Sequence, residues 1–162
     1  SATYETVMAQ MRENQRSYVW SSITSVEELG QVRMSAMETF LADYETGKHQ
    51  GRYIAGALPS LPFERGTFDI ALSSHFLFLY SALLSADFHL QALTEMLRVA
   101  REVRVFPLLT LEGAPSPHYE SVTAQLANRG YRTEVVQVPY EFQRGGNTML
   151  VMTDGATAAR LY

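Results

Sequence analysis

The sequence contains no cysteine, which excludes disulfide bonds and thiolate zinc sites. It has no apolar run close to the roughly 20 residues that a membrane-spanning helix needs. Lys and Arg number 13 against 17 Asp and Glu, and this net charge of -4 does not favour a nucleic-acid surface. Its histidines do not have metal-ligand spacing: His49, His75, His89 and His118. Because the first residues do not resemble a signal peptide, we expect a cytoplasmic protein. From the preceding observations we expect no membrane, metal or nucleic-acid partner.

The first 60 residues contain no glycine-rich turn; their glycines are Gly30, Gly47, Gly51 and Gly56. None of these forms a Gly-x-Gly turn between an apolar strand and a helix, the motif that lets a backbone approach a nucleotide. A Walker-type phosphate loop and a Gly-x-Ser-x-Gly nucleophile turn are also absent. The sequence therefore does not support P-loop nucleotide hydrolysis or Ser-His-Asp chemistry on a nucleophile elbow.

Apolar periodicity predicts two helices before residue 50. Residues 4–16 have the pattern of a short amphipathic helix. Ser25 and Glu28 form a capping-box pair, and apolar residues then recur at three- and four-residue spacing up to Gly47. A polar linker follows, and Arg52–Ala55 is expected to be a short strand.

The remaining residues alternate between strand and helix patterns. A buried strand ends at Ser73-Ser74-His75, a helix follows Asp87, a second strand covers 103–109, and a helix starts at Ser116. Segments 131–138 and 148–153 are expected to pair as a hairpin. We therefore expect an α/β fold in one domain: a three-layer sandwich with a mainly parallel sheet and a C-terminal antiparallel hairpin. Its parts are N-terminal helices (1–47), an α/β core (48–153) and a tail (154–162).

The stretch LPFERGTFDIALSSHFLFLY resembles the post-adenine loop and fourth strand of class I S-adenosylmethionine-dependent methyltransferases. The likeness continues in register from about Arg52 to Thr153, and the earlier part is similar to an insertion in some uncharacterised bacterial members. The resemblance implies an incomplete Rossmann-like methyltransferase-type sandwich without its glycine-rich cofactor unit. It also implies S-adenosylmethionine as cofactor, with Ala57, Leu58, Ser73 and Ser74 on the cofactor side. Where the family often has an acid that contacts adenine, this chain has Ala57.

Candidate chemical residues lie at strand ends and in loops. His75 follows the central strand and is a candidate general base or substrate partner; the alternative is a histidine that satisfies local backbone. By the resemblance, Tyr18 and Trp20 cover the mouth of the site as an aromatic wall for the substrate, or they pack a lid onto the core. Arg144 beside two glycines is a candidate for an anionic substrate, or a solvated turn residue.

Two explanations for the absent glycine-rich unit stay open: a truncated portion of a longer enzyme, or a natural remnant. The first function hypothesis is methyl transfer to an unidentified small-molecule acceptor. The second is a non-catalytic interaction or self-association module, and a third is another small-molecule-binding α/β protein. Without its neighbours, the Arg52–Ala55 strand is expected to pair elsewhere, to stay unpaired or to be completed by a second copy. Because uncovered strand edges promote association, we predict a homodimer.

Overall fold

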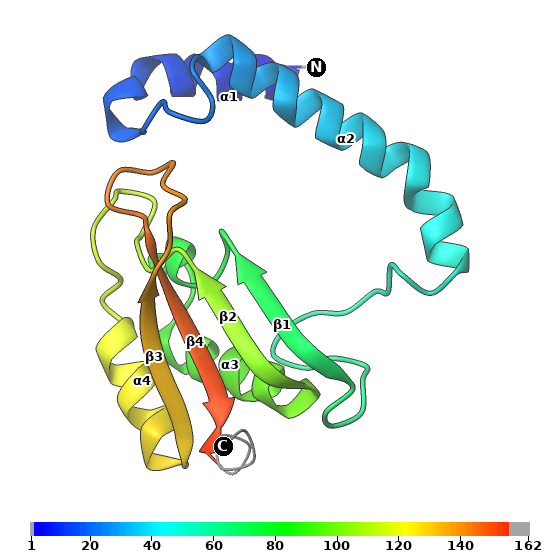
Figure 1. Cartoon of the computed structure of the whole chain (residues 1–162), viewed down its shortest axis with the longest axis vertical. Helices are drawn as coiled ribbons and strands as arrows, with labels where there is room; N and C mark the ends of the chain where they lie inside the picture. The colour runs from blue at the N-terminus through cyan, green and yellow to red at the C-terminus, as the bar shows by residue number, and fades with distance from the viewer. Residues whose placement is uncertain (1, 156–162) are drawn as a thin grey trace. The chain divides into compact units, whose positions relative to one another are not determined.

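In the computed structural model, which describes residues 2–155, the chain divides into an N-terminal unit that ends at Ala55 and a C-terminal unit that begins at Gly56. The N-terminal unit comprises α1 (Ala2–Glu13), the 3-10 turn η1 (Gln15–Ser17) and α2 (Val26–His49) (Figure 1). The predicted cap is confirmed, since Ser25 Oγ accepts the Glu28 N–H at 3.0 Å. The two helices approach closely at Gly30, where a Cβ would lie 2.4 Å from Tyr4 Oη.

The predicted strand at Arg52–Ala55 does not form. The chain turns back at Gly51, whose φ of 71° lies in the left-handed region, and the Arg52 N–H donates to the carbonyl of Gly47 at 2.8 Å. Arg52 then binds Asp43 through both guanidinium Nη atoms, at 2.6 and 2.7 Å. The segment has the residue types of a strand, but no neighbouring strand pairs with it, so its polar groups bond to the end of α2. This helix also continues past the stop predicted at Gly47.

The C-terminal unit contains a four-stranded sheet in the order β1-β2-β4-β3. Its strands are β1 (Phe68–Ser74), β2 (Ala100–Phe106), β3 (Tyr131–Gln137) and β4 (Thr148–Asp154). Strands β1 and β2 are parallel, whereas β4 is antiparallel to both β2 and β3. The α/β class and the terminal hairpin are thus confirmed. The expectation of a mainly parallel sheet is wrong, because one pairing among the described strands is parallel and two are antiparallel.

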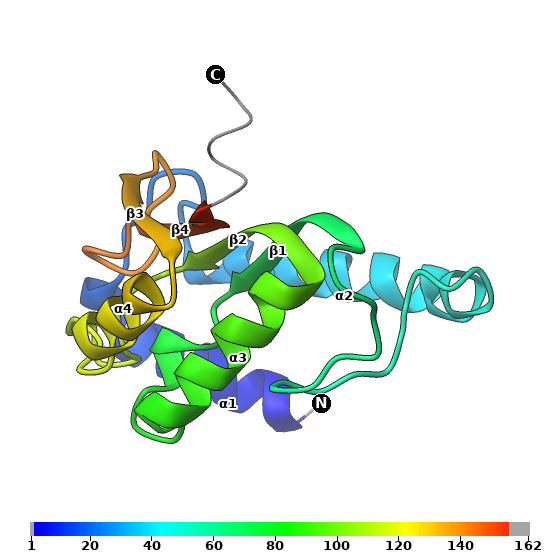
Figure 2. The same ribbon diagram turned by 90° about the horizontal axis from the view of Figure 1, so that it is seen from below.

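Two helices, α3 (Ala86–Val99) and α4 (Tyr119–Asn128), cover one face of this sheet (Figure 2). Between them and the sheet lies the core, whose buried members include Leu93, Met96, Val103, Val105, Val122, Leu126, Leu150 and Met152. The opposite face carries the side chains of Phe68, Ile70 and Leu72, and Leu72 is 71% exposed. Within this unit the described elements therefore make two layers instead of the three expected. The helices of the crossovers β1–α3–β2 and β2–α4–β3 pack on the same side of the sheet.

Between β1 and α3 the chain forms the 3-10 turn η2 (Phe78–Tyr80), and Ser85 caps α3 by accepting the Phe88 N–H at 3.2 Å. Pro107 directly follows β2. Proline has no N–H to donate to a neighbouring strand, so it is disfavoured inside the strand. Of the predicted tail, Asp154 belongs to β4, and residues 156–162 lie outside the described part of the chain.

Candidate functional site

A groove of about 460 Å³ runs along β1, and we call it the β1 groove. Its walls come from the loop before β1, from β1 itself, from the segment after β1 and from α3: Leu58, Leu61, Phe68, Ile70, Ala71, Leu72, Ser73, Ser74, Phe76, Met96 and Val99. Three predicted cofactor-side residues, Leu58, Ser73 and Ser74, thus line one groove. Ala57 is not among the lining residues; it is exposed, and its carbonyl accepts the Ser60 N–H at 3.0 Å.

The loop wall of the groove is bonded to α3. Glu95 Oε1 accepts the Leu61 N–H at 2.7 Å, and Arg98 donates to both carboxylate oxygens of Glu95 at 2.7 Å. Arg98 also donates to the carbonyl of Leu61 at 3.2 Å. The bonds from Arg98, and then the one from Leu61, lower the pKa of Glu95 to about 2 despite partial burial. The position of Leu61 is therefore fixed by a charged network and not only by apolar contact.

Polar groups gather where β1 ends, at the carboxyl end of the parallel pair. Ser73 is buried, and its Oγ has no hydrogen-bond partner among the described residues. Ser74 Oγ lies 2.7 Å from His75 Nδ1, and the His75 N–H donates to the carbonyl of Phe106 at 2.6 Å. His75 has a φ of 54°, a left-handed conformation that histidine adopts uncommonly. Strained residues of this kind cluster at functional sites.

An aromatic row continues from His75 across the end of the sheet. The His75 ring meets Phe106 edge-on with centroids 5.5 Å apart, and Phe106 meets Tyr140 at 5.9 Å. Sequence reasoning missed Phe106 and Tyr140. Phe106 is the last residue of β2, so the rule that neighbouring parallel strands end at a common edge would have found it. Tyr140 reaches this row through the antiparallel pairing of β4 with β2, and local sequence contains no signal for that.

Arg144 lies exposed in the same β3–β4 loop as Tyr140. The loop is held by Gln143, whose Nε2 donates to the carbonyl of Thr110 at 2.9 Å. Arg144 therefore belongs to the end of the sheet that carries His75. Its role with an anionic substrate stays a prediction.

Tyr18 and Trp20 lie in the N-terminal unit. Their rings are half-buried and meet edge-on with centroids 6.2 Å apart. Trp20 Nε1 donates to the carbonyl of Gln15 at 2.9 Å, which ties the segment after η1 to that turn. The structure brings these two residues together, and their role as a substrate wall stays a prediction.

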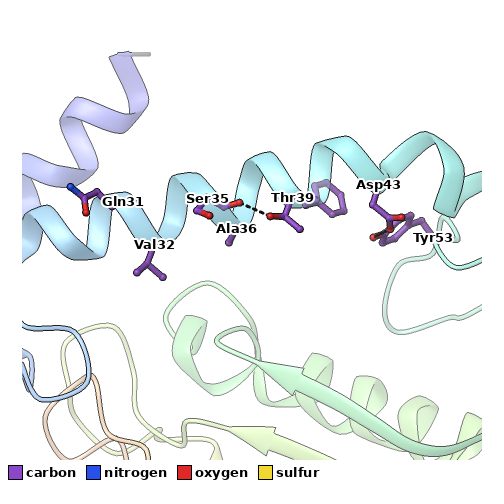
Figure 3. Close-up of a pocket in the computed structure, with 8 residues that line it drawn as sticks. Gln31, Val32, Ser35, Ala36, Thr39, Asp43 and Tyr53 are labelled. Carbon is purple, nitrogen blue, oxygen red and sulfur yellow. Dashed lines mark hydrogen bonds between the residues drawn. The ribbon is translucent and has the colours of Figure 1, made fainter.

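A second hollow, of about 770 Å³, follows α2 from Gln31 to Asp43 and reaches Tyr53 (Figure 3). Asp43 is its only acid, but the carboxylate accepts from Arg52 and from the Tyr53 hydroxyl at 2.7 Å. These bonds, that from Arg52 first, lower the pKa of Asp43 to about 2. An ionised carboxylate with both partners in place is suited to closing the chain onto α2, not to accepting a proton from a substrate.

Among the described residues, no group of three or more His, Cys, Asp or Glu is arranged to hold a metal ion. In the same part of the chain, every helix is too short or too polar to cross a membrane.

No known family model matches the chain, and no solved structure matches it. The chain is similar to an uncharacterized protein of Methanocaldococcus jannaschii, with 32% identity over 136 residues. The matched region is 84% of this chain and 58% of that relative. The chain thus spans less than two thirds of the relative it matches, and the relative's name assigns no activity.

Proposed function

We propose that the C-terminal unit forms one wall of a Rossmann-like site of the class I methyltransferase type, and that the complete protein transfers a methyl group to a small-molecule acceptor. The observation that carries this proposal is the position of Leu58, Ser73 and Ser74. They come from a loop and from the end of β1, yet they line the same groove. The resemblance names these positions as cofactor-side, and their common groove agrees with it.

The architecture of the unit supports the proposal. Ligands of open α/β sheets bind beyond the carboxyl ends of parallel strands, where Ser74 and His75 lie. A volume of about 460 Å³ is within the range of roughly 300–1,000 Å³ typical of small-molecule sites. The parallel pair followed by an antiparallel hairpin is also the ending that the resemblance implies.

The aromatic row at the end of the sheet, whose members are not among the residues that line the β1 groove, suits a sulfonium cofactor. S-adenosylmethionine supplies an electrophilic methyl group on a positively charged sulfur when it is bound. Aromatic faces attract cations, so the row of His75, Phe106 and Tyr140 suits that charge. His75 is the candidate base for an acceptor that must lose a proton.

The chain contains no glycine-rich loop, so it supplies only part of the binding energy. We expect S-adenosylmethionine to bind more weakly than to a protein with both walls. The test is a thermal unfolding titration of this chain with S-adenosylmethionine and S-adenosylhomocysteine. Ligand at 100 times its dissociation constant adds about 2.7 kcal/mol to the unfolding free energy. Ser74→Phe fills the groove and should abolish the shift, whereas Ser121→Phe on the exposed surface of α4 should not. A flat response up to millimolar ligand contradicts the proposal for this chain.

An interaction or self-association module is the second candidate, and the exposed apolar side chains favour it. Helix α2 exposes Val32, Met34, Met37, Phe40 and Leu41, and β1 exposes Ile70 and Leu72. Large contiguous apolar patches on the surface mark interaction sites in soluble proteins. This module would be favoured if the chain does not bind S-adenosylmethionine and if its average molecular mass in solution rises with protein concentration.

A further inference from the structure

The outer edge of β1 offers unpaired backbone groups. Ser74 is paired with Phe106, and the carbonyl of Phe106 accepts the N–H of the next residue, His75. Successive residues of a strand direct their N–H and C=O groups to opposite edges, so those of Ile70, Leu72 and Ser74 face away from β2. Within residues 2–155 no strand pairs with that edge, and Figure 1 shows β1 at the border of the sheet. Such an edge is a template for another strand.

The β1 groove follows this edge. Its lining includes consecutive residues of β1, whose side chains point to opposite faces, together with Met96 and Val99 of α3. The groove therefore borders the edge of the strand itself and not just one face. An extended segment placed there would gain main-chain hydrogen bonds from β1 and apolar contact from α3.

The sequence of β1 is complementary to itself in the antiparallel direction. Ala71 is the central residue of Phe68–Ser74, and a two-fold axis there places Ile70 opposite Leu72 and Asp69 opposite Ser73. The small Ala71 then faces its own copy, and no like charges are opposite each other. In this register the Asp69 carboxylate, which is 88% exposed, lies opposite an uncharged residue.

We propose that β1 pairs antiparallel with β1 of a second copy of this chain about a two-fold axis at Ala71, joining the two sheets into one. The hydrogen-bonded pairs are those between Ile70 and Leu72 of opposite copies, because their backbone groups face the free edge. The exposed Asp69, which in the single chain forms an ion pair with Arg101 at 3.3 Å, comes to lie opposite residue 73 of the second copy. The interface is argued from edge geometry and side-chain pairing and does not rest on the proposed methyltransferase function. Because the partner strand lies along the same groove, it and the proposed cofactor exclude each other in one chain.

The absence of cysteine makes a direct test possible. Ala71 lies at a non-hydrogen-bonded position of the proposed pair, where opposite Cα atoms are about 4.5 Å apart, within the range of disulfides of about 4.4–6.8 Å. We expect Ala71→Cys to oxidise to a covalent dimer at micromolar concentration. Leu83→Cys is the control, since residue 83 is 80% exposed and does not line the groove. Equal cross-linking of the two variants, or none of Ala71→Cys, overturns the proposal.

Two further measurements check the register and the surface. A mixture of Asp69→Cys and Ser73→Cys chains should form the mixed disulfide faster than either variant forms its own.

Leu72→Lys places two ammonium groups near the axis and should weaken dimerisation at least 10-fold in sedimentation equilibrium, whereas Leu83→Lys should leave it unchanged. A wild-type chain that is monomeric at every concentration, or a dimer indifferent to Leu72→Lys, overturns the proposal. None of these readouts involves S-adenosylmethionine, so the result is separable from the ligand titration.

Discussion

The main-chain N–H of Leu61 donates to Glu95 Oε1 at 2.7 Å, a bond between residues 34 positions apart that joins the loop wall of the β1 groove to α3. Arg98, one turn after Glu95, completes the link by bonding both the carboxylate and the carbonyl of Leu61. Hydrogen bonds to a charged group are stronger than neutral ones, so this network sets the width of the groove.

Glu95→Gln is therefore expected to destabilise the C-terminal unit. The amide keeps the shape of the side chain but loses the charge that both partners bond, at a cost of about 1–3 kcal/mol in the free energy of unfolding. Urea denaturation followed by circular dichroism measures this difference. Glu134→Gln on β3 is the matched control and should stay within about 0.5 kcal/mol of wild type, because that carboxylate is exposed. Equal effects of the two variants would contradict the role given to Glu95.

The same network predicts a pH dependence with a definite sign. The folded-state pKa of Glu95 is about 2, below its ordinary value of 4.5. Its contribution to stability is therefore complete above 4.5 and is lost as the pH falls from 4.5 through 2. The difference in unfolding free energy between wild type and Glu95→Gln should be constant near neutral pH and should shrink over that acidic interval. A difference that grows on acidification would show that another group is responsible.

The left-handed backbone of His75 predicts a rank order of substitutions. Asn tolerates positive φ, Gly adopts it freely, and a β-branched Val is strongly disfavoured there. We expect His75→Asn and His75→Gly to remain within about 1 kcal/mol of wild type, and His75→Val to lose about 1–3 kcal/mol. Chemical denaturation of the three variants gives the order. If the His75→Val variant were as stable as the His75→Asn variant, the backbone at residue 75 would not be held in the left-handed conformation.

Local chemistry accounts for what could be predicted from the sequence. The Ser25 cap needs only a side-chain oxygen and the N–H three residues later, and both are local. The end of β1 at Ser73 and Ser74 is similarly visible, because the apolar run stops there. The β3–β4 hairpin joins neighbouring segments, so its pairing needed little long-range information.

The failures have a non-local cause. Arg52–Ala55 has residue types common in strands, but a strand needs a partner ladder, and here the side chains of Arg52 and Tyr53 bond Asp43 instead. The two-layer arrangement depends on which elements cover the second face of the sheet, a property of the whole fold. Tyr140 joined the site by the same kind of long-range pairing, through β4.

Gly47 and Tyr53 permit a double-mutant test of the turn that replaced the predicted strand. In most helix interiors, Gly→Ala stabilises by about 1 kcal/mol, because alanine loses less conformational entropy. At Gly47 a Cβ would lie 2.3 Å from Tyr53 Cε2, so the ring must move and its hydroxyl must give up the 2.7 Å bond to Asp43.

We therefore expect Gly47→Ala to destabilise the N-terminal unit in the wild-type background. In a Tyr53→Ala background, where the ring is absent, the same change should stabilise α2 by about 0.5–1 kcal/mol. Helical circular dichroism during urea denaturation of the four chains gives the coupling free energy. A sign change between backgrounds requires that residues 47 and 53 be in contact. If Gly47→Ala stabilised both backgrounds equally, the chain after α2 would not fold back onto its last turns, and the absence of the Arg52–Ala55 strand would need another cause.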